Sequence, residues 1–96
     1  MKYNLPDRVL QDIRKYAELY GIKKVVLFGS RARGTHSERS DIDIAVSGGN
    51  IAEFSLEIDE KAHTLLMFDV VDFDGYVSEE LQKEIGRDGI VIYEKN

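Results

Sequence analysis

The sequence contains no cysteine, no tryptophan and a single proline among its 96 residues. Without cysteine there can be neither a disulfide framework nor a thiolate metal site, and we expect a reducing, cytoplasmic compartment. No apolar run approaches the roughly 18 residues of a membrane-spanning helix, and the N-terminus lacks a signal-peptide pattern. We therefore expect no membrane association and a single domain over residues 1–96, near the lower size limit for chains that fold without disulfides or metals.

Positive charge is also scarce, because 13 lysine and arginine residues stand against 18 aspartate and glutamate residues, for a formal net charge of −5. Surfaces that bind nucleic acid are normally basic, so this balance argues against direct binding of a long polyanion. One segment departs from it by carrying four basic side chains: Arg31, Arg33, His36 and Arg39. Such a local cluster suits a nucleoside triphosphate better than a nucleic acid; the alternative is a solvated charged loop.

Hydrophobic periodicity predicts alternating helices and strands. The predicted helices cover residues 5–20, 51–64 and 78–86, a helical turn lies within 30–40, and the predicted strands cover 24–28, 41–46, 65–73 and 89–93. The apolar run over residues 65–73 is nearly continuous, which is typical of a strand buried on both faces. The order α-β-turn-β-α-β-α-β predicts an α/β fold with a small mixed sheet flanked by helices.

The strongest pattern is the segment VVLFGSRARGTHSERSDIDIAV, residues 25–46, in which two apolar strands are joined by a polar excursion. Gly29 and Ser30 close the first strand. Glycine lets the backbone approach a ligand closely, and Ser30 offers a hydroxyl at the start of the predicted helical turn, where N–H groups point outward. This corner is a candidate cradle for phosphates.

Two aspartates, Asp41 and Asp43, open the second strand of that segment. Because side chains alternate along a strand, carboxylates at i and i+2 project on one side, about 7 Å apart. Two neighbouring carboxylates repel each other and are costly to bury without a partner. Mg²⁺ resolves this conflict, because it takes hard oxygen ligands together with substrate phosphates. The spacing therefore predicts nucleotide chemistry at a metal-binding site.

A third carboxylate is expected, because two-metal catalysis places a metal ion on each side of the reacting phosphorus. The third predicted strand and the residues just beyond it offer Asp69, Asp72 and Asp74. Asp69 lies between Phe68 and Val70, in the middle of the apolar run, where an unpaired charge costs most and most needs a metal. We favour Asp69 and keep Asp72 as the second choice. The structural alternative is that Asp69 pairs with a lysine or binds a backbone group.

The two histidines, His36 and His63, have no cysteine or histidine partner at metal-binding spacing, so a zinc site is not expected. We expect His63 to lie on the surface of a helix. His36 is expected to be a solvated loop residue, with contact to a phosphate as the alternative.

The segment GSRARGTHSERSDIDIAV resembles the signature of the polymerase-beta-like nucleotidyltransferase superfamily: a Gly-Ser pair, ten residues, and then Asp-Ile-Asp. The short chain looks like the smallest branch, the minimal nucleotidyltransferase (MNT) proteins, which are commonly the antitoxins of HEPN/MNT toxin–antitoxin pairs. The resemblance implies a polymerase-beta-like palm. It also agrees with Asp69, because MNT proteins carry their third acid in a strand of the form apolar-Asp-apolar-apolar.

The resemblance implies transfer of AMP from ATP to an acceptor hydroxyl, with two Mg²⁺ ions and with pyrophosphate leaving. The implied acceptor is a tyrosine of a HEPN-type ribonuclease toxin, which this protein would silence as an antitoxin. The implied site has two parts, the catalytic and metal-binding Asp41, Asp43 and Asp69, and the nucleotide-binding Gly29, Ser30, Arg33 and Arg39. Arg33 or Arg39 would neutralise charge on the leaving pyrophosphate.

Two other interpretations remain open. A non-catalytic antitoxin would neutralise the toxin by occlusion alone, although three carboxylates argue against a vestigial site because unused buried acids are costly. Transfer to a small-molecule hydroxyl, such as that of an aminoglycoside, is the other. Larger relatives such as kanamycin nucleotidyltransferase have an acceptor-binding domain, which we do not expect in this chain because nothing follows Asn96.

Overall fold

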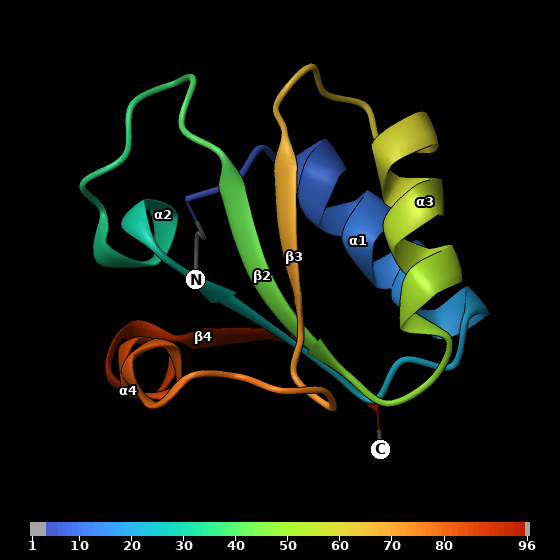
Figure 1. Ribbon diagram of the computed structural model, residues 1–96. Helices are drawn as coiled ribbons and strands as arrows, with labels where there is room; N and C mark the ends of the chain where they lie inside the picture. Colours follow the sequence, from blue (N-terminus) through green and yellow to red (C-terminus); the bar gives the residue numbers. More distant parts are fainter. Residues whose placement is uncertain (1–3, 96) are drawn as a thin grey trace.

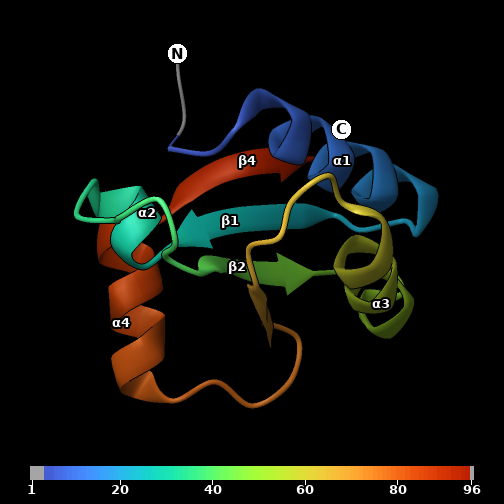
Figure 2. The same ribbon diagram turned by 90° about the horizontal axis from the view of Figure 1, so that it is seen from above.

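One mixed sheet of four strands, in the order β3-β2-β1-β4, forms the centre of the protein (Figures 1 and 2). The computed structural model describes residues 4–95. In chain order the elements are α1 (Asp7–Leu19), β1 (Lys24–Phe28), α2 (Ser30–Arg33), β2 (Ile42–Ser47), α3 (Ile51–Lys61), β3 (Phe68–Asp72), α4 (Glu79–Asp88) and β4 (Ile90–Glu94). The predicted α/β fold with a small mixed sheet flanked by helices is confirmed, and so is the predicted order of its elements.

The pairing of the strands brings three chain segments together at one end of the sheet. β1 runs antiparallel to β2 and to β4, whereas β2 and β3 are parallel. β1 therefore ends, at Phe28, where β2 and β3 begin, at Ile42 and Phe68 (Figure 1). We call this the motif end of the sheet, because the chain of residues 25–46 turns there.

The two faces of the sheet are covered unequally. Figure 1 shows α1 and α3 on one side of the sheet and α2 and α4 on the other. Side chains alternate along a strand. Towards α1 and α3, β2 presents Ile42, Ile44 and Val46, which are fully buried in one core with Ile13 and Phe54. A smaller buried cluster lies on the α4 side of the sheet: Phe28, Ala45 and Ile85.

The third strand corrects our prediction. Instead of a strand over residues 65–73 that is buried on both faces, β3 is shorter and lies at the edge of the sheet, with β2 as its ladder partner. Phe68 and Val70 pack against the core under α1 and α3. The side of β3 towards α4 is more open, and Asp69 is exposed. The apolar run therefore reflects one buried face and an apolar loop before the strand.

The other bounds agree with the predictions to within a few residues. α1 begins at Asp7 rather than at residue 5, directly after Pro6, whose missing N–H costs nothing at a helix start. α4 continues to Asp88 rather than ending at residue 86, and the Ser78 hydroxyl accepts a hydrogen bond from the N–H of Leu81 as its N-cap. No helix within residues 4–95 combines the length and the hydropathy that crossing a bilayer requires.

His63 lies at the surface, as expected, but it does not belong to a helix. α3 ends at Lys61, which leaves His63 in the following loop. There its backbone N–H donates to Asp12 Oδ2 over 2.8 Å, and its ring Nδ1 lies 2.8 Å from the same oxygen. Burial alone would raise the pKa of Asp12, but the bonds from His63 and the charge of Arg8 outweigh it and hold the pKa below its ordinary value. His63 therefore ties α1 to the end of α3.

Candidate functional site

Gly29 and Asp43 are in direct contact at the motif end. Phe28, the last residue of β1, is the ladder partner of Asp43 in β2, so the next residue of the chain turns over that carboxylate. Gly29 makes this turn with φ of +74°, and a Cβ added to it would overlap Asp43 Oδ2. A side chain is thus excluded both by the backbone conformation and by the carboxylate. The glycine of the motif is required by the close approach of Asp43.

Ser30 is the first residue of the short helix α2 and is partly exposed. The Gly29 carbonyl accepts hydrogen bonds from the N–H groups of Ala32 and Arg33, which closes the first turn. No side chain caps the start of this helix. Ser30 thus directly follows the glycine that contacts the Asp43 carboxylate, and the phosphate cradle stays a prediction.

The parallel register of β2 and β3 brings Asp69 to Asp43. The two residues are ladder partners, so their side chains project on the same face of the sheet, the one towards α4. Asp41 lies one residue before β2, and its charge acts on Asp43. Asp43 is half-buried, whereas Asp41 and Asp69 are exposed. Asp69 is therefore not the buried charge predicted from the apolar run, and the register is what brings this residue to Asp43.

Asp72 is directed elsewhere. Its ladder partner is Val46, and because it is three residues after Asp69 its side chain alternates to the opposite face. Asp72 Oδ1 accepts a hydrogen bond of 2.9 Å from the N–H of Asp74, and Asp74 Oδ2 accepts one of 2.8 Å from Gly48. Both carboxylates hold the turn that leaves β3. The structure thus separates the two candidates for a third acid, with Asp69 beside Asp43 and Asp72 away from it.

The carboxylates at the motif end repel one another. Burial and the charges of Asp69, Asp41 and Glu84, in that order, raise the pKa of Asp43 to about 6, and the charge of Arg33 opposes them. Near neutral pH the ionised cluster is therefore held together at a cost in free energy. A bound cation would remove this cost.

Glu84 is a member of this cluster that the sequence analysis missed. It lies on α4, next to Ile85, which is buried against the sheet. Arg33 Nη1 lies 3.6 Å from Glu84 Oε2 and 3.6 Å from Asp88 Oδ2. Helix α4 thus supplies two acids that hold Arg33 beside Asp43. No motif marks Glu84, and only the packing of α4 against the sheet identifies it.

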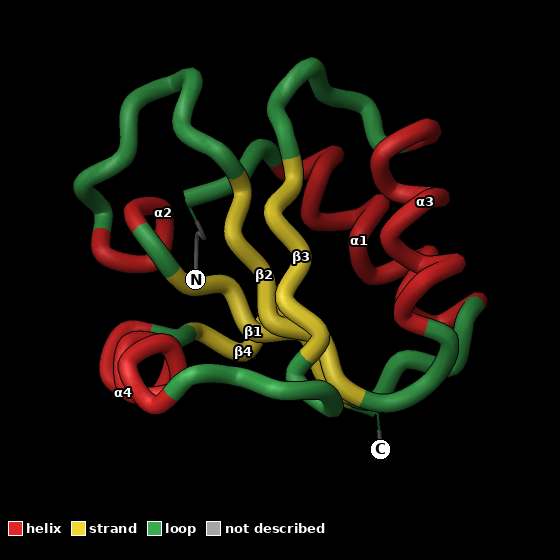
Figure 3. Tube along the Cα trace, viewed as in Figure 1, coloured by secondary structure: helices red, strands yellow, loops and turns green. Residues whose placement is uncertain are grey.

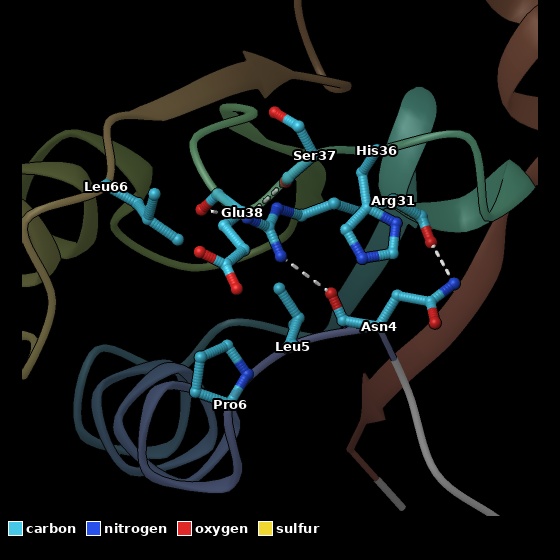
Figure 4. A pocket seen from close by; sticks show the side chains of 8 residues that line it. All are labelled: Asn4, Leu5, Pro6, Arg31, His36, Ser37, Glu38 and Leu66. Atoms are coloured by element: carbon cyan, nitrogen blue, oxygen red, sulfur yellow. Dashed lines mark hydrogen bonds between the residues drawn. The ribbon is translucent and has the colours of Figure 1, made fainter.

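Arg31 has a structural role, which separates it from the other basic residues of the motif. It is only 4% exposed, although it is a cation. Its guanidinium donates to the carbonyl oxygens that border its loop: Asn4 at 2.9 Å, Ser40 at 3.1 Å, Glu38 at 3.2 Å and Ser37 at 3.4 Å (Figure 4). Arg31 therefore fixes the path of the loop between α2 and β2 and the segment that leads into α1.

His36 is half-buried, and this corrects the expectation of a solvated residue. Its Nδ1 is buried and makes no hydrogen bond within residues 4–95. The ring lines a cavity of about 600 Å³ between its loop and the start of α1 (Figure 4), together with Asn4, Leu5, Pro6, Arg31, Ser37, Glu38 and Leu66. None of Asp41, Asp43 and Asp69 lines this cavity, so it is separate from the carboxylate cluster.

Arg39 is exposed and lies on the same loop, close to Asp41. Both line a second cavity of about 390 Å³, whose other walls are three consecutive apolar residues: Leu65, Leu66 and Met67. Arg33 and Arg39, the two arginines predicted to bind the nucleotide, thus have different surroundings: Arg33 on α2 is paired with acids of α4, and Arg39 lies near Asp41 on the loop before β2.

No three histidine, cysteine, aspartate or glutamate side chains within residues 4–95 form a group that could hold a metal ion by themselves. Mg²⁺ is usually bound by one or two carboxylates and completed by waters and substrate phosphates, rather than by a cage of protein ligands. The repulsion at Asp43 fits an ion that binds together with a nucleotide. The donor set is therefore compatible with magnesium.

The chain is similar to known nucleotidyltransferases. Residues 11–96 match the family model described as "Polymerase beta, Nucleotidyltransferase". MJ0604 of Methanocaldococcus jannaschii, named as a candidate protein adenylyltransferase, is 47% identical over 60 residues, which are 62% of this chain and 58% of that protein. The match thus spans less than two thirds of the length of this curated relative.

Two solved structures share the fold. A toxin–antitoxin complex with AMP-PNP has a chain that is 26% identical, with a TM-score of 0.70 over 90% of this chain and 73% of the other. A tyrosine-to-alanine variant of the MntA–HpeT toxin–antitoxin complex has a chain that is also 26% identical, with a TM-score of 0.67 over 95% of this chain and 74% of the other.

Proposed function

Because the chain belongs to the polymerase beta nucleotidyltransferase family, we propose that it transfers AMP from ATP to a hydroxyl group of a partner protein. The observation that carries this proposal is the register that pairs Asp69 with Asp43 directly over Gly29. It joins a carboxylate cluster to the Gly29–Ser30 corner at which helix α2 begins. This is the arrangement that nucleotidyl transfer requires.

The nucleotide is bound through its phosphates. Gly29 and the Ser30 hydroxyl contact the β- and γ-phosphates, because they stand at the start of α2, where no side chain caps the helix. Arg33 and Arg39 offset the charge of the triphosphate from two sides. The solved structure of a related toxin–antitoxin complex with AMP-PNP supports ATP as the substrate.

Asp41, Asp43 and Asp69 are the residues that would hold two Mg²⁺ ions. When bound, magnesium neutralises the phosphates and lowers the pKa of the acceptor hydroxyl. In the transfer step, the acceptor oxygen forms a bond to the α-phosphorus. The bond from that phosphorus to the bridging oxygen of the β-phosphate breaks, and pyrophosphate leaves with the bonding electrons. We assign the acceptance of the hydroxyl proton to Asp69, the exposed acid on the edge strand.

The acceptor that we propose is a tyrosine of a HEPN-type toxin in the cytoplasm, so that this protein acts as an antitoxin. Two observations support a protein partner. The structural neighbours come from toxin–antitoxin complexes, and the curated relative carries the name of a protein adenylyltransferase. The HEPN class and the tyrosine follow from the resemblance of the motif to MNT proteins.

A second candidate function is neutralisation by binding alone. It is favoured by the exposed apolar side chains of Leu65, Met67 and Tyr76, which a partner could cover without any chemistry. An enzyme acts in substoichiometric amounts and leaves a covalent mark, whereas an occluding antitoxin must be present at least one-to-one and loses its effect on dilution.

The experiment that separates the two functions uses a tenfold molar excess of the toxin encoded beside this protein. The toxin is incubated with this protein and Mg·ATP, this protein is removed, and toxin activity and intact mass are measured. We expect inactive toxin that has gained one AMP, and unmodified toxin when ATP is omitted or Asp43→Asn replaces the wild type. Full recovery of toxin activity without a mass change would refute the transferase proposal.

A further inference from the structure

The three residues that precede β3 form an apolar surface beside the carboxylate cluster. Leu65 is 102% exposed and Met67 69% exposed, whereas Leu66, between them, is half-buried and packs against the core. We call Leu65, Leu66 and Met67 the apolar shelf. Figure 3 shows its loop at the same end of the sheet as the loop that leads into β2. Exposing two large apolar side chains so close together is unfavourable unless a partner covers them.

The backbone of the apolar shelf is held in place rather than free. The Met67 carbonyl accepts a hydrogen bond of 2.9 Å from the N–H of Ile42, which continues the ladder between β2 and β3 beyond the strand. The N–H of Leu66 donates to Thr64 Oγ1 over 3.0 Å. Because the ladder fixes Met67 next to the residue that follows Asp41, the shelf has a defined position relative to the carboxylates.

The cavity beside the apolar shelf is also lined by two residues of the proposed active site. Its remaining walls are Asp41, a proposed metal ligand, and Arg39, a proposed phosphate ligand. One wall of the cavity is therefore apolar and the other is charged. A ligand that fits both walls has an apolar body and a polar end, and its polar end would face Asp41.

We infer that the apolar shelf binds the side chain that accepts AMP, and that this side chain is an aromatic hydroxyl of the partner protein. The inference rests on the proposed function, including its tyrosine acceptor, and adds the place at which the acceptor side chain binds. A cavity of about 390 Å³ accommodates an aromatic ring, which would cover Leu65 and Met67. The thioether of Met67 makes favourable contacts with aromatic rings. A serine or threonine acceptor would leave the shelf uncovered, and a sugar would lack polar partners along it.

The test compares serine variants of the apolar shelf with serine variants of leucines elsewhere. Leu65→Ser, Met67→Ser and the double variant are compared with Leu19→Ser and Leu56→Ser, which change leucines that are 64% and 59% exposed on α1 and α3. Initial rates of AMP transfer are measured against the concentration of the toxin and, separately, of ATP. We expect the KM for the toxin to rise about tenfold in the double variant, because one apolar contact of this size is lost. The KM for ATP should remain unchanged in the double variant. The KM for the toxin should remain unchanged in both control variants.

Further outcomes decide the inference. Met67→Leu, which keeps the surface apolar, should retain the KM for the toxin to within about twofold. An unchanged KM for the toxin in the double variant, or an equal rise in the two controls, would overturn the inference while the transferase function stands. An equal rise in the KM for ATP would assign the shelf to the nucleotide and would also overturn it. If the wild type itself transfers no AMP, the proposed function fails and this inference fails with it.

Discussion

The two faces of the sheet use the same strands in opposite ways. On the face towards α1 and α3, β2 buries Ile42, Ile44 and Val46 completely. On the face towards α4, the same strand presents Asp43, whose pKa is raised to about 6 by burial and by neighbouring carboxylates. Burial of an aliphatic side chain stabilises the fold by roughly 1.5–3 kcal/mol. The carboxylates on the other face repel one another, and this repulsion destabilises the fold.

This difference places stability and chemistry on separate residues of one strand. Alternation makes the separation possible, because neighbouring residues of β2 face opposite environments. The α1–α3 face fixes the backbone, and the backbone in turn holds the carboxylates close together despite their repulsion. We therefore expect changes on the α4 face to affect transfer far more than stability, and changes on the α1–α3 face to do the reverse.

The largest expected effect separates the two acids of the third strand. Asp69→Asn should reduce AMP transfer by about a thousandfold, because it removes a charge at the reacting centre. Asp72→Asn is the matched control, since Asp72 lies only three residues away but holds the turn after β3. It should keep transfer within a few-fold of the wild type. Initial rates at saturating Mg·ATP measure both, and a dead Asp72→Asn with an active Asp69→Asn would remove Asp69 from the site.

A second prediction compares the effect of a valine-to-alanine substitution on the free energy of unfolding at the two faces of the sheet. Val46 is fully buried towards α1 and α3, whereas Val91 of β4 lies on the α4 side and is 42% exposed. Val46→Ala should lower the free energy of unfolding by about 2 kcal/mol, and Val91→Ala should lower it by less than about 0.5 kcal/mol. Urea unfolding followed by circular dichroism measures both. Equal losses would mean that the α4 face carries as much of the stability as the other face.

The local parts of this architecture follow from the sequence, and the non-local parts do not. The strand before Gly29 and the pair Asp41 and Asp43 are marked by contiguous residues, so periodicity and spacing predict them. The position of Asp69 depends on the parallel pairing of β2 with β3, which joins segments 26 residues apart in the register. The apolar residues of 65–73 suggest a central strand. A strand with one buried face that follows the apolar shelf has nearly the same sequence pattern as a strand with two buried faces.

The basic residues of the motif illustrate the same limit. Arg31 and Arg33 are two positions apart in α2, yet one is buried against carbonyl oxygens and the other is paired with acids of α4. Asn4 and Glu84, which define these two environments, lie 27 residues before Arg31 and 51 residues after Arg33. A local charge count cannot distinguish these roles, since it contains neither partner.

The smallest expected effect tests the cost of the carboxylates directly. Asp43 has a pKa of about 6 in the folded protein, above the ordinary aspartate value of 3.8, so the folded state binds more protons than the unfolded state between these values. The free energy of unfolding of the wild type without metal should therefore fall as the pH rises from about 4 through 6.

The variant Asp43→Asn removes this charge and keeps the shape of the side chain beside Gly29. The variant should match the wild type near pH 4 and exceed it by about 1 kcal/mol above pH 7, because water at the half-buried site screens part of the repulsion. Thermal or urea unfolding in EDTA across this range measures the difference. A variant that is less stable than the wild type at pH 7 would show that Asp43 stabilises the α4 face, and the contrast between the two faces would then be wrong.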